Sequence, residues 1–302
     1  MDLIIPRRSS YCPNFATAPR LVLNGGMTTT QTWLITGASS GLGLALTKQA
    51  LAAGHHVVAT TRKEALPVKD PRLTVARLDP ADREGCRHAV EEASRVTGRL
   101  DVLVNNAGYG LVGAVEEISE AEARAILDVD LFGPMWMTQA ALPIMRRHGH
   151  GHVVQISSTG GVGAMPFLGL YNAAKWGLEG FSEALAAEVQ SMGIRVTLAE
   201  IGAMDTQWAT SGMRFSEPNS DYDELREQLL GTATVPWPSE PGATGGGTAP
   251  DEVARSILTH VAAESGPLRL VLGDGAADQI TTVLERRRQD YSTQPGFQRT
   301  QN

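Results

Sequence analysis

The sequence predicts an α/β fold in which one domain is built on a doubly wound parallel sheet. Between Thr32 and Gly202, short β-rich runs alternate with longer helical patterns. This alternation requires parallel strands covered by helices on both faces. Because crossover connections are right-handed, a doubly wound sheet of the Rossmann type is almost the only arrangement left.

The predicted elements follow one another in a regular order. Strands are expected at TWLIT (32–36), HVVAT (56–60), LTVARLD (73–79), DVLVNNAG (101–108), HVVQISS (152–158), IRVTLAEIG (194–202) and LRLVLG (268–273). Helices are expected at residues 42–54 and 83–97, from about 120 leading into a longer helix through Phe132 to 147, and at 171–192, 251–264 and from about 276. Asp251 is expected to cap the helix that it begins.

Two segments fall outside the alternation. Residues 1–26 hold three prolines and three arginines without sustained periodicity, and Met27 begins MTTTQTWLITG, which looks like a natural start. The extension is interpreted as read-through from an upstream start codon, a disordered tail or a targeting segment, and the domain is expected to occupy residues 27–302. Residues 203–250 are irregular and rich in Pro and Gly, which is typical of a lid or a binding loop.

Composition excludes several classes of protein. The net charge of −7, without a basic stripe, argues against a nucleic-acid partner. Cys12 and Cys86 suit neither a disulfide framework nor a metal site, which favours a cytoplasmic protein. No apolar stretch is long enough to span a membrane. No metal site is expected, because the histidines beside predicted strands lack carboxylates at ligand spacing and are interpreted as surface turn residues: His55, His56, His148, His150 and His152.

The glycine-rich segment TGASSGLG (36–43) predicts a dinucleotide-binding loop, because it follows a predicted strand and begins a helix. Gly37 permits the tight turn, Gly41 allows the backbone to approach a pyrophosphate, and Gly43 allows close packing of helix on strand. The helix N-terminus supplies N–H groups and partial positive charge to phosphates. A plain strand–helix turn would need one glycine rather than three. The loop residues expected at the cofactor are Gly37, Ser39, Ser40, Gly41, Leu42 and Gly43.

The end of the second predicted strand favours NADP over NAD. An NAD site usually has an acid there, about twenty residues after the loop, that binds the ribose 2′-hydroxyl. This chain has Thr61 followed by Arg62, and a guanidinium is a bidentate partner for a 2′-phosphate. Ser39 and Thr61 would add hydroxyl donors. The alternative is that Arg62 is a solvated surface residue.

Tyr171 and Lys175 are four residues apart and therefore lie on the same face of a predicted helix. An ammonium beside a phenol stabilises the phenolate and lowers the pKa of the tyrosine. Such a tyrosine can exchange a proton with an alcohol or a ketone. Ser158 lies thirteen residues before Tyr171, and this spacing selects it over its neighbour Ser157.

With the glycine loop, NNAG (105–108) and the Ser158–Tyr171–Lys175 set, the chain resembles the short-chain dehydrogenase/reductase family. Its closest likeness is to the ketone-reductase-like and hydroxysteroid-dehydrogenase-like members. The likeness is tight from Thr32 to Gly202 and looser from Asp251 onward. It implies an NADP(H)-dependent oxidoreductase that moves a hydride between nicotinamide and a carbonyl or secondary alcohol carbon. The family also implies a homodimer or homotetramer paired through the helices near 131–147 and 171–192.

The resemblance also implies roles for individual residues. Tyr171 would be the general acid/base, Ser158 would hold the substrate oxygen, and Lys175 would bind the nicotinamide ribose and lower the pKa of the tyrosine. Further cofactor contacts are expected from Asp79 at the adenine, from Asn106, Ala107 and Gly108 at the adenine ribose, and from Gly202 and Thr206 at the nicotinamide carboxamide.

Two positions depart from the family pattern. Asp130 stands where the family usually has an asparagine that holds a water of the proton relay, and Ile201 stands where a proline usually precedes the glycine. The aspartate is expected to keep the relay with a shifted pH optimum, and an Asp130→Asn variant with an unchanged pH–rate profile would count against this. Ile201 is expected to make the loop less stiff.

Two alternatives remain for the function. One is a dinucleotide-binding regulatory protein that has lost catalysis, and the other is an epimerase or dehydratase on the same fold. The substrate is expected to be a bulky hydrophobic ketone or alcohol, since apolar side chains precede Tyr171 and begin the insert. These are Met165, Phe167, Leu168, Trp208, Met213 and Phe215, and the competing interpretation is that several are only core.

Overall fold

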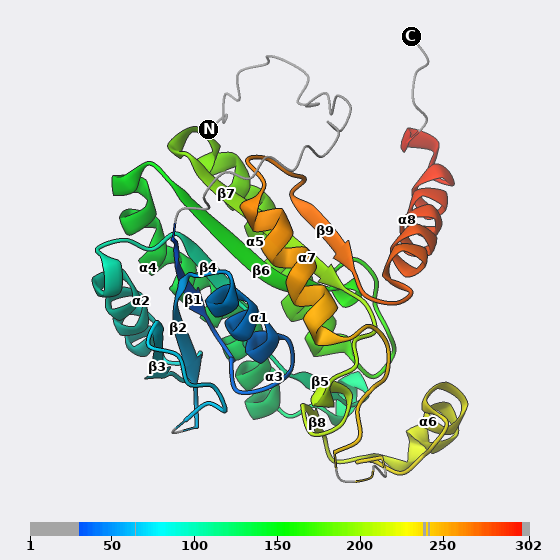
Figure 1. Ribbon diagram of the computed structural model, residues 1–302. Helices are drawn as coiled ribbons and strands as arrows, with labels where there is room; N and C mark the ends of the chain where they lie inside the picture. The colour runs from blue at the N-terminus through cyan, green and yellow to red at the C-terminus, as the bar shows by residue number, and fades with distance from the viewer. Residues whose placement is uncertain (1–29, 64, 238–239, 241, 298–302) are drawn as a thin grey trace.

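The computed structural model describes residues 30–63, 65–237, 240 and 242–297. Residues 1–26, for which three interpretations were open, lie outside this range. Seven strands form one parallel sheet in the order β3-β2-β1-β4-β6-β7-β9, which confirms the predicted doubly wound fold (Figure 1). The strands are β1 (Thr32–Ile35), β2 (His56–Thr61), β3 (Leu73–Arg77), β4 (Val102–Asn105), β6 (Gly151–Ser158), β7 (Ile194–Ile201) and β9 (Arg269–Leu272).

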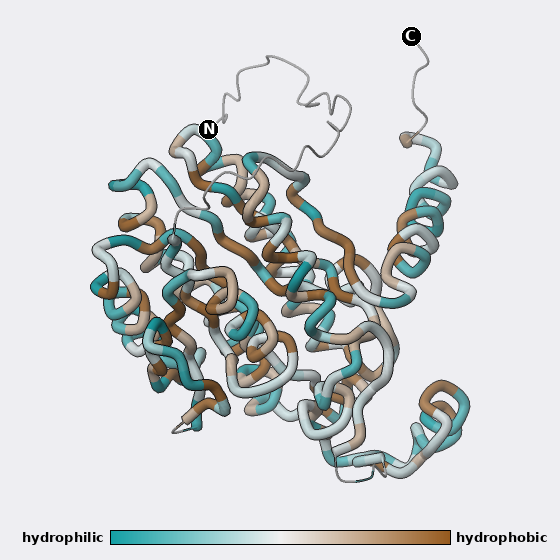
Figure 2. The backbone as a smooth tube through the Cα atoms, viewed as in Figure 1, coloured by the Kyte–Doolittle hydropathy of each residue, from teal (hydrophilic) through white to brown (hydrophobic). Residues whose placement is uncertain are grey.

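Helices cover both faces of this sheet. On one face α1 (Gly41–Ala52) and α7 (Pro250–Ala262) pack on the central strands, with Trp33, Leu46 and Ile257 in one buried cluster. On the other face lie α2 (Arg83–Thr97), α4 (Gly133–His148) and α5 (Gly169–Val189). Figure 2 shows the hydrophobic strands between these layers. At the C-terminal side, α8 (Ala276–Ser292) stands at the edge of the molecule beyond β9.

The long helical region after residue 120 is not one continuous helix. The α3 helix (Glu120–Leu127) and α4 are joined by a π-helical turn, η2 (Asp128–Phe132), that contains the buried Asp130. Wide turns of this kind often occur at functional sites. The prediction for Asp251 was wrong, because the N-cap of α7 is Ala249, Pro250 is the first helical residue, and no side chain caps the helix.

The insert is more regular than its composition suggested. It contains the short strand β8 (Met213–Phe215), which pairs with β5 (Gly110–Val112), and the helix α6 (Asp223–Leu230). A buried ion pair between Arg226 of α6 and Glu117 holds the insert to the chain after β5. Breaking one partner of a buried pair costs about 3–5 kcal/mol, so this contact fixes the position of the insert.

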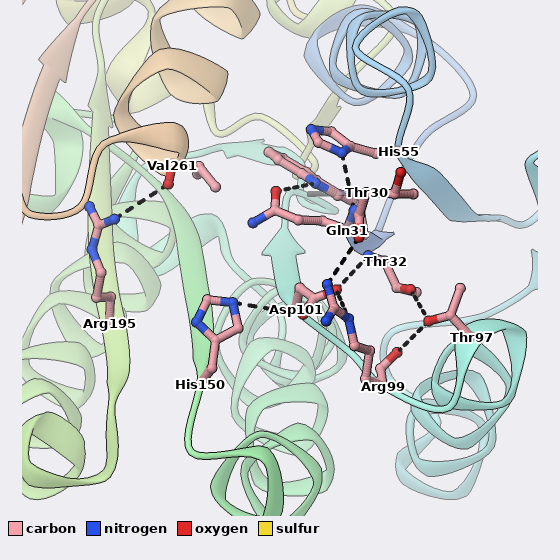
Figure 3. A network of polar contacts seen from close by, with 11 residues as sticks. Thr30, Gln31, Thr32, His55, Thr97, Arg99, Asp101, His150, Arg195 and Val261 are labelled. Carbon is pink, nitrogen blue, oxygen red and sulfur yellow. Dashed lines mark hydrogen bonds and ion pairs between the residues drawn. The ribbon is translucent and has the colours of Figure 1, made fainter. Parts of the chain in front are cut away.

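A network of polar residues closes the amino-terminal end of the sheet (Figure 3). Asp101 accepts hydrogen bonds from Thr32 N at 2.7 Å and Arg99 Nε at 3.0 Å. Deeper in the fold, Thr197 Oγ1 lies 2.8 Å from His152 Nε2 and 2.9 Å from His260 Nε2.

The interpretation of the strand-flanking histidines as surface residues was wrong for two of them. His55 and His152 are 8% and 3% exposed, because the ring of His55 stacks on Trp33 and that of His152 lies against His260 of α7. Within the residues that the structure describes, no three His, Cys, Asp or Glu side chains are grouped as metal ligands. None of the helices in this part of the chain has both the length and the apolar character needed to cross a membrane.

Candidate active site

The carboxyl ends of the central strands bring Ser158 and Tyr171 together. Ser158 is the last residue of β6, and Tyr171 lies in the first turn of α5. They meet around Gly160, where an added Cβ would lie 3.1 Å from Tyr171 Cε1 and 3.4 Å from Ser158 Oγ. Gly160 N also donates to Ser158 Oγ at 3.1 Å, which orients the hydroxyl. The serine that the spacing argument selected therefore lies beside the tyrosine, whereas Ser157 points to the opposite side, toward Glu179.

Lys175 lies one helical turn after Tyr171 and is almost fully buried. Its Nζ donates to the carbonyl oxygen of Ile156 at 3.1 Å and lies 3.3 Å from Asp130 Oδ2. The same Nζ is 5.7 Å from the centre of the Tyr171 ring. Asp130 is 0% exposed, and its Oδ1 accepts from Tyr109 N at 3.1 Å. The structure thus brings all four predicted catalytic side chains into one cluster.

The charges of this cluster are set by burial and by one another. Burial raises the pKa of Tyr171 more than Lys175 and the Ser158 hydroxyl lower it. The expectation that the lysine leaves the pKa of the tyrosine below its ordinary value was therefore wrong for the protein alone. Burial also raises the pKa of Asp130. Burial lowers the pKa of Lys175, but Asp130 and Tyr171 raise it more, so the lysine stays cationic.

The glycine loop forms the turn that the sequence predicted. Gly37 and Gly41 have φ of +67° and +52°, where L side chains are strained. A Cβ on Gly43 would lie 2.5 Å from both Gly37 O and Asn106 Nδ2. No side chain caps the first turn of α1 at Ser40, so its backbone N–H groups remain for an anion.

The NNAG turn is joined to this loop through Thr36. Asn106 N and Ala107 N both donate to Thr36 Oγ1, at 2.9 and 3.0 Å. The amide of Asn106 also donates to Thr36 O at 2.8 Å. Gly108 faces the catalytic cluster, because a Cβ there would lie 2.7 Å from Asp130 Oδ2. One short turn therefore connects the glycine loop with the lysine–aspartate pair.

Arg62 and Asp79 lie at the ends of neighbouring strands. Thr61 ends β2 and pairs in register with Arg77 of β3, and Leu78 N donates to Thr61 O at 3.1 Å. Arg62 and Asp79 follow directly and are both exposed. Among the described residues, the guanidinium of Arg62 has neither a hydrogen-bond nor an ion-pair partner. Both residues therefore lie where the adenine end of a dinucleotide would be expected.

The segment after β7 closes the site from the other side. Gly202 N donates to Leu272 O at 2.8 Å, and a Cβ on Gly202 would lie 2.6 Å from Asp274 O. Thr206 is buried against the glycine loop, with its Cγ2 3.5 Å from a Cβ placed on Gly41. Trp208 then packs on Tyr171, with ring centroids 5.3 Å apart and tilted by 54°.

Most of the predicted apolar wall surrounds Tyr171. Trp208 and Leu168 join Leu111 and Tyr171 in one cluster, and the neighbouring cluster includes Phe167, Met213 and Phe215. Met165 is the exception, since it is 50% exposed. Sequence reasoning missed Leu111, Tyr109, Tyr222 and Trp237, because they reach this wall only through the β5–β8 pairing and the folded insert.

Phe167 has an unusual backbone in this wall. Its φ of +64° is rare for a bulky residue. Its ring meets Tyr222 edge-on at 6.3 Å and lies 5.7 Å from the guanidinium of Arg226. The insert therefore holds the strained loop that leads into Tyr171.

Comparison with known proteins assigns the chain to a family. The model for short chain dehydrogenases matches residues 31–214, more than half of the chain. Oxidoreductase BOA17 of Botryotinia fuckeliana is 36% identical over 85% of this chain and 93% of its own length. The 3-ketodihydrosphingosine reductase of Bacteroides thetaiotaomicron is 35% identical, covering 80% of this chain and 87% of its own. Human retinol dehydrogenase 8 is 39% identical, covering 79% of this chain and 80% of its own length. The chain belongs to the short-chain dehydrogenase/reductase family and is an oxidoreductase of that family.

Solved structures agree with this assignment. A short-chain dehydrogenase from Streptomyces avermitilis is 37% identical, with a TM-score of 0.78 over 91% of this chain and all of the other. Two more distant structures share the fold. One, from Burkholderia cenocepacia, holds NADP (24% identity, TM-score 0.68, covering 87% and 97% of the two chains). The other, from Burkholderia phymatum, holds NAD (19% identity, TM-score 0.72, covering 89% of this chain and 97% of the other).

Proposed function

We propose that this protein is an NADP(H)-dependent oxidoreductase that transfers a hydride between nicotinamide and a carbonyl or secondary alcohol carbon of a hydrophobic substrate. One observation carries the proposal: Tyr171, Ser158, Lys175 and Asp130 meet in one buried cluster at the carboxyl end of the sheet. A glycine cradle lies beside it, and Thr206 and Asn106 join the two. The residues fit a dinucleotide, because the first turn of α1 has no side-chain cap at Ser40 and its backbone N–H groups can bind a phosphate, while Gly37 and Gly41 hold the turn at positive φ.

The side chains have complementary roles in carbonyl reduction. Ser158 Oγ and the Tyr171 hydroxyl donate to the carbonyl oxygen while negative charge develops on it, which stabilises the transition state. Tyr171 then gives its proton to that oxygen. Lys175 stays cationic and stabilises the phenolate that remains, and the Ile156 carbonyl and Asp130 hold the lysine in place. Lys175, Gly202 and Thr206 would hold the nicotinamide, which would supply the hydride when bound.

Two further residues adjust the site. Asp130 accepts from Tyr109 N and faces Lys175, so it can accept a proton beside the lysine. Trp208 covers Tyr171 and excludes water from the reacting oxygen. The segment 202–208 must move for a substrate to reach the tyrosine, which makes it part of the binding step.

The preference for NADP rests on Arg62. Its free guanidinium follows Thr61 at the end of β2, the position at which an NAD site usually has an acid. We expect Arg62→Glu to weaken NADPH binding by about 10–100-fold, because a charge-assisted bidentate contact becomes a repulsive one. NADH binding should change little, so fluorescence titration with both cofactors measures the preference. Equal loss for both cofactors would contradict the assignment of Arg62 to the 2′-phosphate.

The wall of the site suggests a large apolar substrate. Leu111, Leu168, Trp208 and Met213 offer apolar and adaptable surface around Tyr171. Two relatives carry names that specify such compounds, a retinol and a 3-keto sphingoid base. A long-chain ketone should therefore be reduced with a much higher kcat/KM than a short-chain ketone that has only two or three carbons besides its carbonyl carbon.

Replacement of the tyrosine tests the reaction directly. We expect Tyr171→Phe to lose at least about 10³-fold in turnover, since proton transfer and half of the oxyanion contact disappear together. NADPH binding should stay within about twofold, because the cradle is untouched. The assay follows NADPH oxidation with a panel of hydrophobic ketones, and binding is measured by fluorescence. Retained turnover in this variant would refute the proposal.

The alternative functions are weaker. A regulatory protein that binds the dinucleotide without catalysis would not need Lys175 buried beside Tyr171 and paired with Asp130. Binding of NADPH without turnover of any carbonyl in the panel would favour it. For an epimerase or dehydratase, the products of the same panel would show rearrangement or loss of water instead of reduction.

A further inference from the structure

Behind the catalytic lysine lies a second buried group of ionisable side chains, which the proposed reaction does not use. The glutamate cluster consists of Glu179, Glu200, Arg269 and Ser157. Glu179 follows Lys175 by one helical turn, and Glu200 lies near the end of β7 in register with Ser157 of β6. Glu179 and Glu200 are 6% and 1% exposed.

One cation serves two buried carboxyl groups in this cluster. Arg269 Nε lies 2.9 Å from Glu200 Oε1, and Arg269 Nη2 lies 3.3 Å from Glu179 Oε2. The same guanidinium also pairs with the half-exposed Glu183. Burying an uncompensated negative charge is costly, and two carboxyl groups that share a site do not both ionise readily. The cluster therefore favours a bound proton.

Two buried oxygen atoms of the cluster face each other. Among the described residues, Glu179 Oε1 and Ser157 Oγ are buried without a hydrogen-bond partner. They face a common space, because a Cβ on Gly161 would lie 2.7 Å from Ser157 Oγ and 3.3 Å from Glu179 Oε1. The Ser157 hydroxyl can donate to an ionised Glu179 and accept from a protonated one, so this pair of oxygens can accommodate either charge state of the glutamate.

Three consecutive residues of β6 connect the cluster to the active site. The carbonyl of Ile156 accepts from Lys175, the side chain of Ser157 faces Glu179, and Ser158 lies beside Tyr171. The charge of Glu179 also raises the pKa of Lys175. A change of charge in the cluster is therefore felt by the lysine that stabilises the phenolate.

We propose that Glu179 and Glu200 share one proton in the folded enzyme near neutral pH, and that its release to solvent tunes the ionisation of Tyr171 through Lys175. The second part rests on the proposed role of Tyr171. Release breaks one carboxyl O–H bond and passes the proton to water past Arg269, whose side chain is 40% exposed. Glu179 and Glu200 are thus positioning residues, which act through the lysine.

The charged groups around the glutamate cluster set the pH range in which the shared proton is released. Burial and the charge of Glu179 together raise the pKa of Glu200 to about 7, although Arg269 lowers it. Burial likewise raises the pKa of Glu179, while Ser157 and Arg269 lower it and Glu183 opposes them. On the other side, Lys175 faces Asp130 and Tyr171. The shared proton is therefore expected to leave as the pH rises through about 7.

The shared proton can be observed without catalysis. The infrared spectrum of the wild-type protein should show a protonated-carboxyl band that disappears as the pH rises through about 7. Glu200→Gln should remove this band, while Glu183→Gln, the matched exposed partner of the same arginine, should keep it. If the wild type shows no buried carboxyl band at pH 6, or if Glu183→Gln removes it, the shared proton is refuted.

The coupling is measured by the pH dependence of kcat/KM for alcohol oxidation. The glutamine in Glu200→Gln cannot acquire negative charge. The acidic limb of the variant's pH–rate profile should therefore move to lower pH by about half a unit. Glu183→Gln should match wild type. If the infrared band titrates but the acidic limb of the kcat/KM profile does not move in Glu200→Gln, the shared proton stands and its coupling to Tyr171 is refuted. An absence of turnover in wild type would refute the proposed function and leave the infrared result standing.

Discussion

The two ends of the parallel sheet both bury ionisable groups, but they differ in how completely those groups are paired. At the amino end Asp101 accepts from Thr32 N and Arg99, and Arg195 donates to the last carbonyls of α7 (Figure 3). At the carboxyl end, Asp130 Oδ2, Ser157 Oγ and Glu179 Oε1 lack hydrogen-bond partners in the described part of the chain. Unpaired buried groups cost stability, and the carboxyl end holds several of them in the described residues, whereas at the amino end His152 Nδ1 is without a partner.

Under the proposed function, this difference assigns chemistry to the carboxyl end and stability to the amino end. Ion pairs placed for stability give their carboxylates full sets of donors. Ion pairs placed for proton transfer keep a free lone pair that can receive the proton. Under the proposed function the Lys175–Asp130 pair is of the second kind, because its contact is long, at 3.3 Å, and among the described residues Asp130 Oδ2 faces no donor other than Lys175.

The strongest test replaces the Lys175–Asp130 pair with apolar residues. Lys175→Met alone leaves Asp130 buried without its cation and should cost about 3–5 kcal/mol of unfolding free energy. The double variant Asp130→Leu with Lys175→Met should recover most of this loss or exceed wild-type stability by about 1–4 kcal/mol. Turnover should be lost in both. Urea unfolding and NADPH oxidation measure the two quantities, and a double variant less stable than the single one would contradict the comparison.

The opposite outcome is expected at the amino end. Asp101→Asn removes a charge-assisted acceptor from Thr32 N and Arg99, and the loss should be about 1.5–3 kcal/mol of unfolding free energy. Turnover at 25 °C should match wild type, because Asp101 lies at the far end of β4 from Asn105 and the catalytic cluster. A fall in kcat without a fall in stability would show that this end also takes part in catalysis.

The carboxyl end was also the more predictable from sequence. Glycines at 37, 41 and 43, the NNAG turn and the Tyr171–Lys175 spacing are local patterns, and local geometry dictates their chemistry. The strand and helix order followed from periodicity in the same way, and α2 was predicted to its first and last residues. The π-helical turn at Asp130 was not predictable, since propensity does not distinguish one wide turn from a continuous helix.

Features that depend on long-range packing escaped prediction. Burial decides the direction of the Tyr171 pKa, and the extent of burial comes from Trp208 of the insert. The pairing of β5 with β8 joins residues a hundred positions apart. The buried histidines His55 and His152 were misassigned for the same reason, because a polar residue beside a strand is exposed unless a distant helix covers it.

The smallest expected effect is the pH dependence of stability, which should have opposite signs at the two ends of the sheet. At the amino end, burial lowers the pKa of His152 well below its ordinary value and lowers those of His260 and His55. The unfolded chain therefore binds more protons below pH 6.5, and stability falls as the pH drops, by up to about 1.4 kcal/mol per pH unit for each histidine. His152→Gln should reduce this slope and leave turnover unchanged.

At the carboxyl end the sign is reversed. The pKa of Glu200 rises from 4.5 to about 7 in the folded protein, so the folded state binds the extra proton and stability falls as the pH rises between these values. Glu200→Gln should remove a loss of about 2–3 kcal/mol between pH 4.5 and 7. In wild type the two trends oppose each other and flatten the curve of unfolding free energy against pH. Chemical unfolding at several pH values should therefore show His152→Gln relatively more stable in acid and Glu200→Gln relatively more stable above pH 7. If the curves of unfolding free energy against pH ran parallel for the two variants, the predicted difference in sign between the two ends of the sheet would be contradicted.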